Sequence, residues 1–202
     1  MLYINLIYKM SSQFDNSKMS SQFDNSKMSS QIEISKMNLD TNIPTGTWTL
    51  YFHSPEETKW TLNTFISLGS MKNWQEFWTI IDALHQDSLS DGMFFMMRDP
   101  SPPLWESHQH IRGGCYSFRC HKKDASDIYV NHIIATMIDS ITINTQNRIN
   151  GISISPKRGF NIIKIWNIDA QKFNSPSNIN TNVCASVREG DIIYTPFVQK
   201  KM

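Results

Sequence analysis

The stretch TWTLYFHSPEETKWTLNTFI, residues 47–66, marks where the folded part of the chain starts. Apolar and polar side chains alternate in TWTLYFH (47–53), and a similar alternation follows in WTLNTFI (60–66). The polar segment SPEETK (54–59), which contains a proline, separates the two runs. A period of two residues is typical of strands with one buried face, so we expect two β-strands joined by a turn.

A helical pattern follows these two strands, and further strands come after it. Apolar residues recur at steps of three and four between residues 71 and 84, namely Met71, Trp74, Phe77, Trp78, Ile81 and Leu84. This spacing predicts a helix. A second helix is expected at 126–140, with Ile128, Ile134, Met137 and Ile138 facing inward. Further strands are expected at 92–97, 114–120, 149–155, 160–166 and 191–197. Strands with short links and two interspersed helices predict an α+β domain, in which helices cover one face of a curved antiparallel sheet.

The N-terminal part of the chain consists largely of a nine-residue repeat. KMSSQFDNS begins at Lys9 and again at Lys18, and KMSSQIEIS follows at Lys27. Units this short bury too little apolar surface to offset the entropy of ordering the chain. We therefore expect a disordered tail at 1–44 and a single domain at 45–202; a docking peptide for a partner is the alternative for the tail.

Composition and charge exclude several classes of protein. The net charge is +1, so any contact with RNA must come from a local patch. Three cysteines are too few for a disulfide framework and fit a reducing compartment. No apolar run approaches the roughly 18 residues needed to span a bilayer, and the opening MLYINLIY lacks the features of a signal peptide.

The sequence offers little support for an enzyme or a metal site. It contains no G-x-S-x-G or H-E-x-x-H motif. The cluster of His108, His110, Cys115, Cys120 and His121 does not have the ligand spacing of zinc fingers or ribbons. We expect no catalytic residue, no metal and no cofactor.

Two tryptophans occupy positions that suit a binding site better than a core. Trp48 lies within an alternating strand, which predicts a core position, and Trp78 on the helix suits either the core or a surface anchor. Trp60 follows a polar turn, and Trp105 lies in the loop PPLWESHQH with Glu106 beside it. Large aromatic side chains in loops are good stacking platforms.

Six short motifs in order resemble the eukaryotic translation initiation factor 4E family. They are TWTLYF (47–52), TKW (58–60), EFWTIIDAL (76–84), PLWE (103–106), RGG (112–114) and IIKIW (162–166). Each motif alone is weak, but their order and spacing are consistent from Trp48 to Trp166. The resemblance implies a curved sheet with its helices on the convex face, and binding of the 7-methylguanosine cap of mRNA.

The resemblance also assigns roles in cap binding. Trp60 and Trp105 would sandwich the methylated guanine, Glu106 would accept hydrogen bonds from its N1–H and N2–H, and Trp166 would lie near the methyl group. Methylation at N7 leaves a delocalised positive charge, which favours stacking between indoles. Lys157 would contact the triphosphate.

Some positions depart from the family pattern. Cys115 stands where the family has a cation, Tyr116 replaces the tryptophan that follows, and Ile162 replaces a second phosphate-binding lysine. Lys164, on the same strand parity as Ile162, and Arg158 could substitute for these cations. The resemblance thus predicts an intact base pocket with a rearranged phosphate site.

The resemblance places a partner site on the convex face. Trp78 would anchor a partner peptide there, together with Trp74 and Ile138. Positions that are usually Val and Leu read Trp74, Asn131 and Ala135 here, which favours an altered choice of partner. We expect a cytoplasmic monomer that binds capped mRNA and recruits a scaffold protein in translation initiation. The alternatives are an interaction module that has kept the fold only, and a repressor that sequesters caps.

Overall fold

The computed structural model describes residues 39–84, 86–183 and 187–198. The chain divides into two units, Met1–Thr41 and Asn42–Met202. Residues 39–41 of the first unit form a turn and a bend, and the predicted repeats at 9–35 lie outside the described residues. The second unit carries the sheet and helices that follow.

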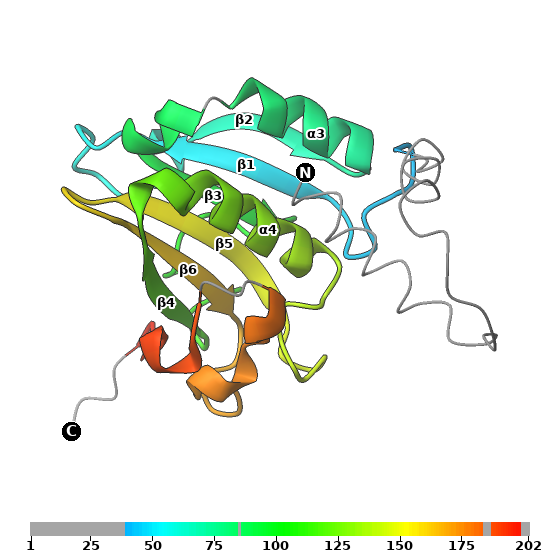
Figure 1. Ribbon diagram of the computed structural model, residues 1–202, viewed down its shortest axis with the longest axis vertical. Coiled ribbons are helices and arrows are strands. Elements are labelled where there is room, and N and C mark those ends of the chain that lie inside the picture. The colour runs from blue at the N-terminus through cyan, green and yellow to red at the C-terminus, as the bar shows by residue number, and fades with distance from the viewer. Residues whose placement is uncertain (1–38, 85, 184–186, 199–202) are drawn as a thin grey trace, which may run out of the picture. The chain divides into compact units, whose positions relative to one another are not determined.

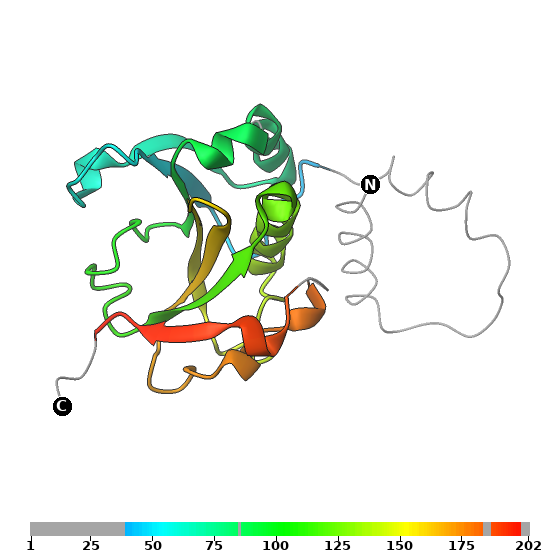
Figure 2. The ribbon, with the colours of Figure 1, turned by 60° about the vertical axis from the view of Figure 1, so that its left-hand side comes forward.

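A seven-stranded antiparallel sheet forms the centre of the second unit (Figure 1), and its strands run in the order β2-β1-β3-β5-β6-β4-β7. Its strands are β1 (Trp48–His53), β2 (Ile66–Met71), β3 (Met93–Arg98), β4 (Gly114–Cys120), β5 (Ile149–Pro156), β6 (Asn161–Asn167) and β7 (Ile193–Pro196). Figure 2 shows the sheet curving, with both α-helices on one side of it. The α+β fold predicted from the sequence is confirmed.

Two α-helices cover one face of this sheet, α3 (Trp74–Ala83) and α4 (Ala125–Met137). Asn73 caps α3 by accepting a 2.8 Å hydrogen bond from the Glu76 backbone N–H, while the Glu76 carboxylate accepts one of 2.7 Å from the backbone of Lys72. This reciprocal arrangement satisfies free donors at the helix start. Short 3-10 turns complete the described structure: η1 (Leu62–Thr64), η2 (Gln86–Ser90), η3 (Lys122–Asp124), η4 (Pro176–Asn178), η5 (Thr181–Val183) and η6 (Glu189–Asp191).

Each helix is shorter than its apolar pattern suggested. The first begins at Trp74 because Met71, predicted as its first residue, ends β2 and is fully buried there. The second ends at Met137, where Ile138 caps the helix and Asp139 takes a positive φ of 55°. Within the described residues neither α-helix is long and apolar enough to cross a membrane.

The strand predicted at 60–66 is wrong. Residues 60–65 form a loop that contains η1, and β2 starts only at Ile66. Thr64 Oγ1 donates a 2.7 Å hydrogen bond to the Thr61 carbonyl, and Thr61 Oγ1 donates to Asn63. Such local side-chain bonds compete with pairing in a sheet. The loop leaves Trp60 on the surface instead of on a strand.

One part of the core lies between the sheet and the two helices. Trp48 is 0% exposed, as predicted, and its Nε1 donates to Thr45 Oγ1 at 2.9 Å. Thr45 Oγ1 in turn donates to the carbonyl of Met137 at the end of α4. Ile43 is also buried, and its N–H donates to the Lys72 carbonyl. Residues 42–44, expected in the tail, are therefore part of the folded unit.

Candidate functional site

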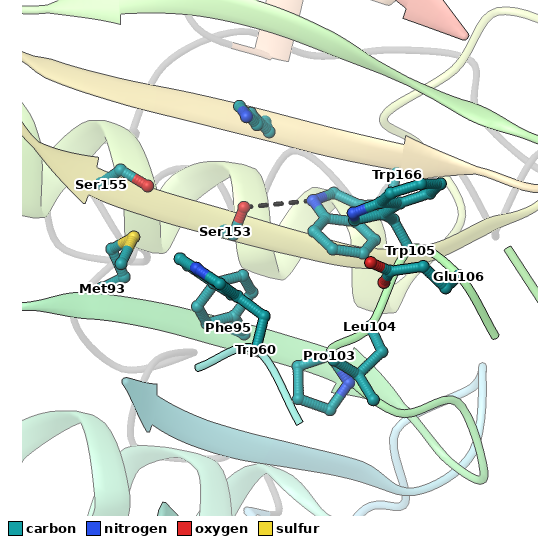
Figure 3. A pocket seen from close by; sticks show the side chains of 11 residues that line it. Trp60, Met93, Phe95, Pro103, Leu104, Trp105, Glu106, Ser153, Ser155 and Trp166 are labelled. Carbon is teal, nitrogen blue, oxygen red and sulfur yellow. Dashed lines mark hydrogen bonds between the residues drawn. The ribbon is translucent and has the colours of Figure 1, made fainter. Parts of the chain in front are cut away.

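A pocket of about 310 Å³ opens on the face of the sheet opposite the helices (Figure 3). The β1–β2 loop contributes to its wall, as do the β3–β4 loop and strands β3, β5 and β6. Its lining residues are Trp60, Met93, Phe95, Pro103, Leu104, Trp105, Glu106, Ser153, Ser155, Lys164 and Trp166. Of the seven residues predicted to bind the cap, the pocket thus brings together Trp60, Trp105, Glu106, Lys164 and Trp166.

Trp166 on β6 forms a rigid inner wall of the pocket. Trp166 is only 5% exposed, and Phe95 and His110 pack edge-on against its ring with centroid distances of 6.0 and 5.4 Å. Trp166 Nε1 donates a 3.1 Å hydrogen bond to Ser153 Oγ on the neighbouring strand (Figure 3). Because the indole N–H is satisfied and the ring is packed, this surface is fixed before any ligand arrives.

The two loop tryptophans form the accessible part of the pocket. Trp60 is 48% exposed and Trp105 is 42% exposed, which is unusual for the largest apolar side chains. Trp60 stacks on His53 with a centroid distance of 4.2 Å and an interplanar angle of 6°. Trp105 lies beside Phe197, with centroids 6.4 Å apart and an angle of 28°. Each indole thus has a neighbouring ring and retains exposed surface for a ligand.

Two further rings, His53 and Phe197, support the loop tryptophans and carry no signal in the sequence. His53 occupies the last position of a strand, where a single histidine gives no signal, and its stacking depends on how the following loop folds back. Phe197 follows β7, and its contact with Trp166 at 5.1 Å depends on the pairing of β7 with β4. Only the three-dimensional arrangement reveals either contact.

Charged groups at the pocket have opposite signs. Glu106 is exposed beside Trp105, and Lys164 lies on β6 directly opposite Ser153 of β5. A ligand that carries both hydrogen-bond donors and negative charge would find a partner for each. Lys157 and Arg158 are exposed at the turn between β5 and β6 and are not among the residues that line the pocket.

His110 holds the β3–β4 loop against the pocket wall. Its ring is fully buried, and burial lowers its pKa to about 4, so the imidazole is neutral at pH 7. Nε2 lies 3.1 Å from the Pro102 carbonyl, which makes it the protonated nitrogen and the donor of a hydrogen bond. This bond joins the two sides of the loop that carries Trp105 and Glu106.

Two departures from the family pattern, Cys115 and Tyr116, are buried, whereas Ile162 is half-buried. Cys115 is 6% exposed, and Tyr116 donates a 2.6 Å hydrogen bond to the Phe173 carbonyl inside the protein. Burial raises the pKa of the Cys115 thiol. Among the described residues, no group of three or more His, Cys, Asp or Glu side chains could hold a metal ion.

The residues predicted to bind a partner differ in how accessible they are. Trp78 on α3 is half-buried and packs edge-on against Phe77 at 5.0 Å. Ile138 after α4 is also half-buried, whereas Trp74 is only 6% exposed and Ala135 is fully buried. Little of Trp74 is therefore available to a partner; it packs against Phe77 in the core instead.

Comparison with known proteins identifies a family that matches most of the chain. The family model of eukaryotic initiation factor 4E matches residues 45–195. Eukaryotic translation initiation factor 4E of Saccharomyces cerevisiae is 26% identical over 138 residues, which cover 64% of this chain and 63% of the yeast protein. The match thus spans less than two thirds of that relative.

Solved structures share the fold. The Ascaris suum eIF4E-3 structure with m7G cap has a TM-score of 0.66 and 14% identity, and the match covers 81% of this chain and 94% of that one. The complex of C. elegans eIF4E-3 with the 4E-binding protein Mextli and cap analog has a TM-score of 0.65 and 12% identity, covering 77% and 91%. Since the family match reaches from before β1 into β7, the chain belongs to the eukaryotic initiation factor 4E family.

Proposed function

We propose that the chain binds the 7-methylguanosine cap of mRNA in the pocket between Trp60, Trp105 and Trp166. One observation carries the proposal: five residues predicted from the sequence for this task line a single pocket of about 310 Å³. Ascaris suum eIF4E-3, which shares the fold, has been solved with an m7G cap. The pocket has aromatic surface for a flat cation and a carboxylate for the donors of guanine.

The roles follow from the chemistry of the ligand. Trp60 and Trp105 stack on the two faces of the methylated base, where each contact contributes on the order of 1–3 kcal/mol. Glu106 accepts hydrogen bonds from N1–H and N2–H. Trp166 offers its fixed surface to the N7-methyl group.

The triphosphate is held by cations on β6 and at the adjacent turn. Lys164 lines the pocket itself and is the first of these cations that a phosphate would meet. Lys157 and Arg158 are exposed at the nearby turn and reach the phosphates farther from the base. Because these long side chains lose rotamer freedom on binding, we expect each to contribute less than the aromatic contacts.

The protein acts in translation initiation by presenting the bound cap to a scaffold protein on its helical face. C. elegans eIF4E-3, which shares the fold, has been solved with a 4E-binding protein. Trp78 on α3 is the anchor for such a partner. Cap recognition needs no bond to be made or broken, so we propose a binding protein without catalysis, working as a monomer in the cytoplasm.

A repressor that sequesters caps remains the second candidate function. The changed helical face favours this candidate. Trp74 and Ala135 are buried there, and Asn131 stands at a position that is usually apolar in the family. A scaffold peptide that fails to bind the intact chain would favour this candidate over initiation.

Titration of the purified chain with 7-methylguanosine triphosphate tests the proposal. Stacking on exposed indoles quenches their fluorescence, so we expect saturable quenching, and at least tenfold weaker binding of unmethylated GTP because it lacks the positive charge. Trp105→Ala serves as the matched variant, since its side chain lies in a loop and its loss leaves no core cavity. Equal binding of both nucleotides, or undiminished binding by Trp105→Ala, would overturn the proposal.

A further inference from the structure

The imidazole of His53 lies flat against the indole of Trp60. The centroids are 4.2 Å apart and the planes differ by 6°, the most parallel ring contact in the described part of the chain. His53 is the last residue of β1 and is 0% exposed, whereas Trp60 is 48% exposed. A fully buried ring therefore backs a half-exposed one.

His53 is itself fixed by the loop that carries Trp60. Its Nε2 lies 3.1 Å from the Lys59 carbonyl and 3.3 Å from Thr64 Oγ1, so the same nitrogen contacts the loop on both sides of Trp60. Phe65 packs against the imidazole at 4.7 Å and against the Trp60 indole at 6.0 Å. The imidazole position is set by the strand, and the loop is arranged around it.

The hydrogen bonds alone do not explain a histidine at this position. The second ring nitrogen, Nδ1, is buried and has no hydrogen-bond partner among the described residues. A buried nitrogen without a hydrogen-bond partner is unfavourable. The benefit of histidine at this position therefore comes from its flat ring, which stacks on the indole. A ring stacked behind an indole restricts its rotation and leaves the opposite face open.

We propose that His53 is a positioning residue that holds the Trp60 indole ready for the base. This inference rests on the proposed function, because it assigns the arrangement of one stacking surface in the same pocket. A side chain that is already ordered loses less entropy on binding, so the backing ring raises affinity without touching the ligand. His53 lies behind Trp60 and is absent from the residues that line the pocket.

Two substitutions separate stacking from hydrogen bonding. His53→Phe keeps a flat ring and removes the hydrogen bonds, whereas His53→Asn keeps a polar group and removes the ring. His121→Asn, at an exposed position outside the pocket, is the matched control. Thermal unfolding of each variant checks that the fold survives.

The first measurement uses the free protein and does not depend on cap binding. We expect the ¹⁵N order parameter of the Trp60 indole, assigned with Trp60→Phe, to fall in His53→Asn and to stay close to the unsubstituted value in His53→Phe. An unchanged order parameter in a folded His53→Asn overturns the inference. If His53→Asn does not fold, a lowered order parameter in folded His53→Phe overturns it.

The second measurement is affinity for 7-methylguanosine triphosphate. We expect about fivefold weaker binding by His53→Asn, within the range for loss of one aromatic pair, and less than twofold change for His53→Phe and His121→Asn. The reverse order of the two His53 variants would show that hydrogen bonds, not stacking, position the loop. If the unsubstituted chain does not bind the nucleotide, the proposed function fails, and the order parameter still decides whether His53 fixes Trp60.

Discussion

At the scale of single residues, we propose that Glu106 gives the pocket its hydrogen-bonding specificity. It is the carboxylate among the lining residues, and its exposure means that substitution leaves the core untouched. We expect Glu106→Gln to weaken binding of 7-methylguanosine triphosphate by roughly 10- to 100-fold, because two charge-assisted hydrogen bonds become at most one neutral bond. Isothermal titration calorimetry measures the change.

Glu189→Gln is the control for this prediction, since Glu189 is exposed on η6 and does not line the pocket. We expect it to bind like the unsubstituted chain. Binding by Glu106→Gln within threefold of the unsubstituted chain would contradict the assigned role of the carboxylate.

Two buried histidines make the fold sensitive to acid. Burial lowers the pKa of His110 and of His132 from the usual 6.5 to about 4. Between these values the unfolded chain binds protons that the folded chain does not, so the free energy of unfolding falls as pH drops from 6.5 to 4. Each histidine contributes at most about 3 kcal/mol to this loss.

Urea unfolding at pH 7.5, 6 and 5 checks the prediction. His132→Leu removes one of these two histidines, so its free energy of unfolding should fall less steeply on acidification. His121→Ala, at an exposed position, should retain the full dependence. Stability that rises on acidification across this range would contradict the assignment.

At the scale of elements, Gly113 joins the β3–β4 loop to the sheet. A Cβ at this position would lie 1.9 Å from the carbonyl oxygen of Asn167, the last residue of β6, so the backbones must approach where only glycine fits. We expect Gly113→Ala to destabilise the fold by about 2–3 kcal/mol and to lower the thermal midpoint by roughly 5–10 °C.

Gly159→Ala is the matched control, because a Cβ there would meet no atom within 4 Å. It lies at the turn between β5 and β6, and we expect it to unfold like the unsubstituted chain. Differential scanning calorimetry of both variants makes the comparison. Equal midpoints for the two variants would show that the backbone at Gly113 shifts without cost.

Periodicity predicted those elements whose own side chains face a core. The strand predicted at 114–120 matches β4 residue for residue, because Tyr116, Phe118 and Cys120 point to buried positions in alternation. The loop at 60–65 alternates as well, yet Trp60 and Leu62 are exposed and local hydrogen bonds hold the chain in a turn. A period of two cannot distinguish these cases, since it does not say what covers the apolar face.

The sequence predicted pocket residues whose own side chains suit a ligand. It did not predict the residues that support those side chains from behind. Trp105 beside Glu106 signals a binding site within a few residues of sequence. His53 lies seven positions before the indole it supports, and Phe197 lies far beyond Trp105 in the chain. Such supporting contacts arise from loop and strand packing, which no local pattern encodes.

At the scale of the whole folded unit, the sheet separates two surfaces. The pocket lies on one face and α3, which carries Trp78, lies on the other (Figures 2 and 3). A change on one face therefore reaches the other only through the packed core. Cap binding and partner binding should accordingly be separable by single substitutions.

Trp78→Ala tests this separation. A half-buried tryptophan at the centre of an interface is a frequent energetic hot spot, so we expect at least roughly 30-fold weaker binding of a peptide with the pattern Tyr-x4-Leu-apolar. The affinity for 7-methylguanosine triphosphate should change less than twofold. Trp105→Ala should give the opposite result, because it removes stacking surface from the pocket and leaves α3 intact. Fluorescence anisotropy of a labelled peptide and calorimetry with the nucleotide measure the two affinities on the same preparations, after thermal unfolding has shown that both variants are folded. Loss of both affinities in a folded Trp78→Ala would mean that the two faces are coupled through the sheet.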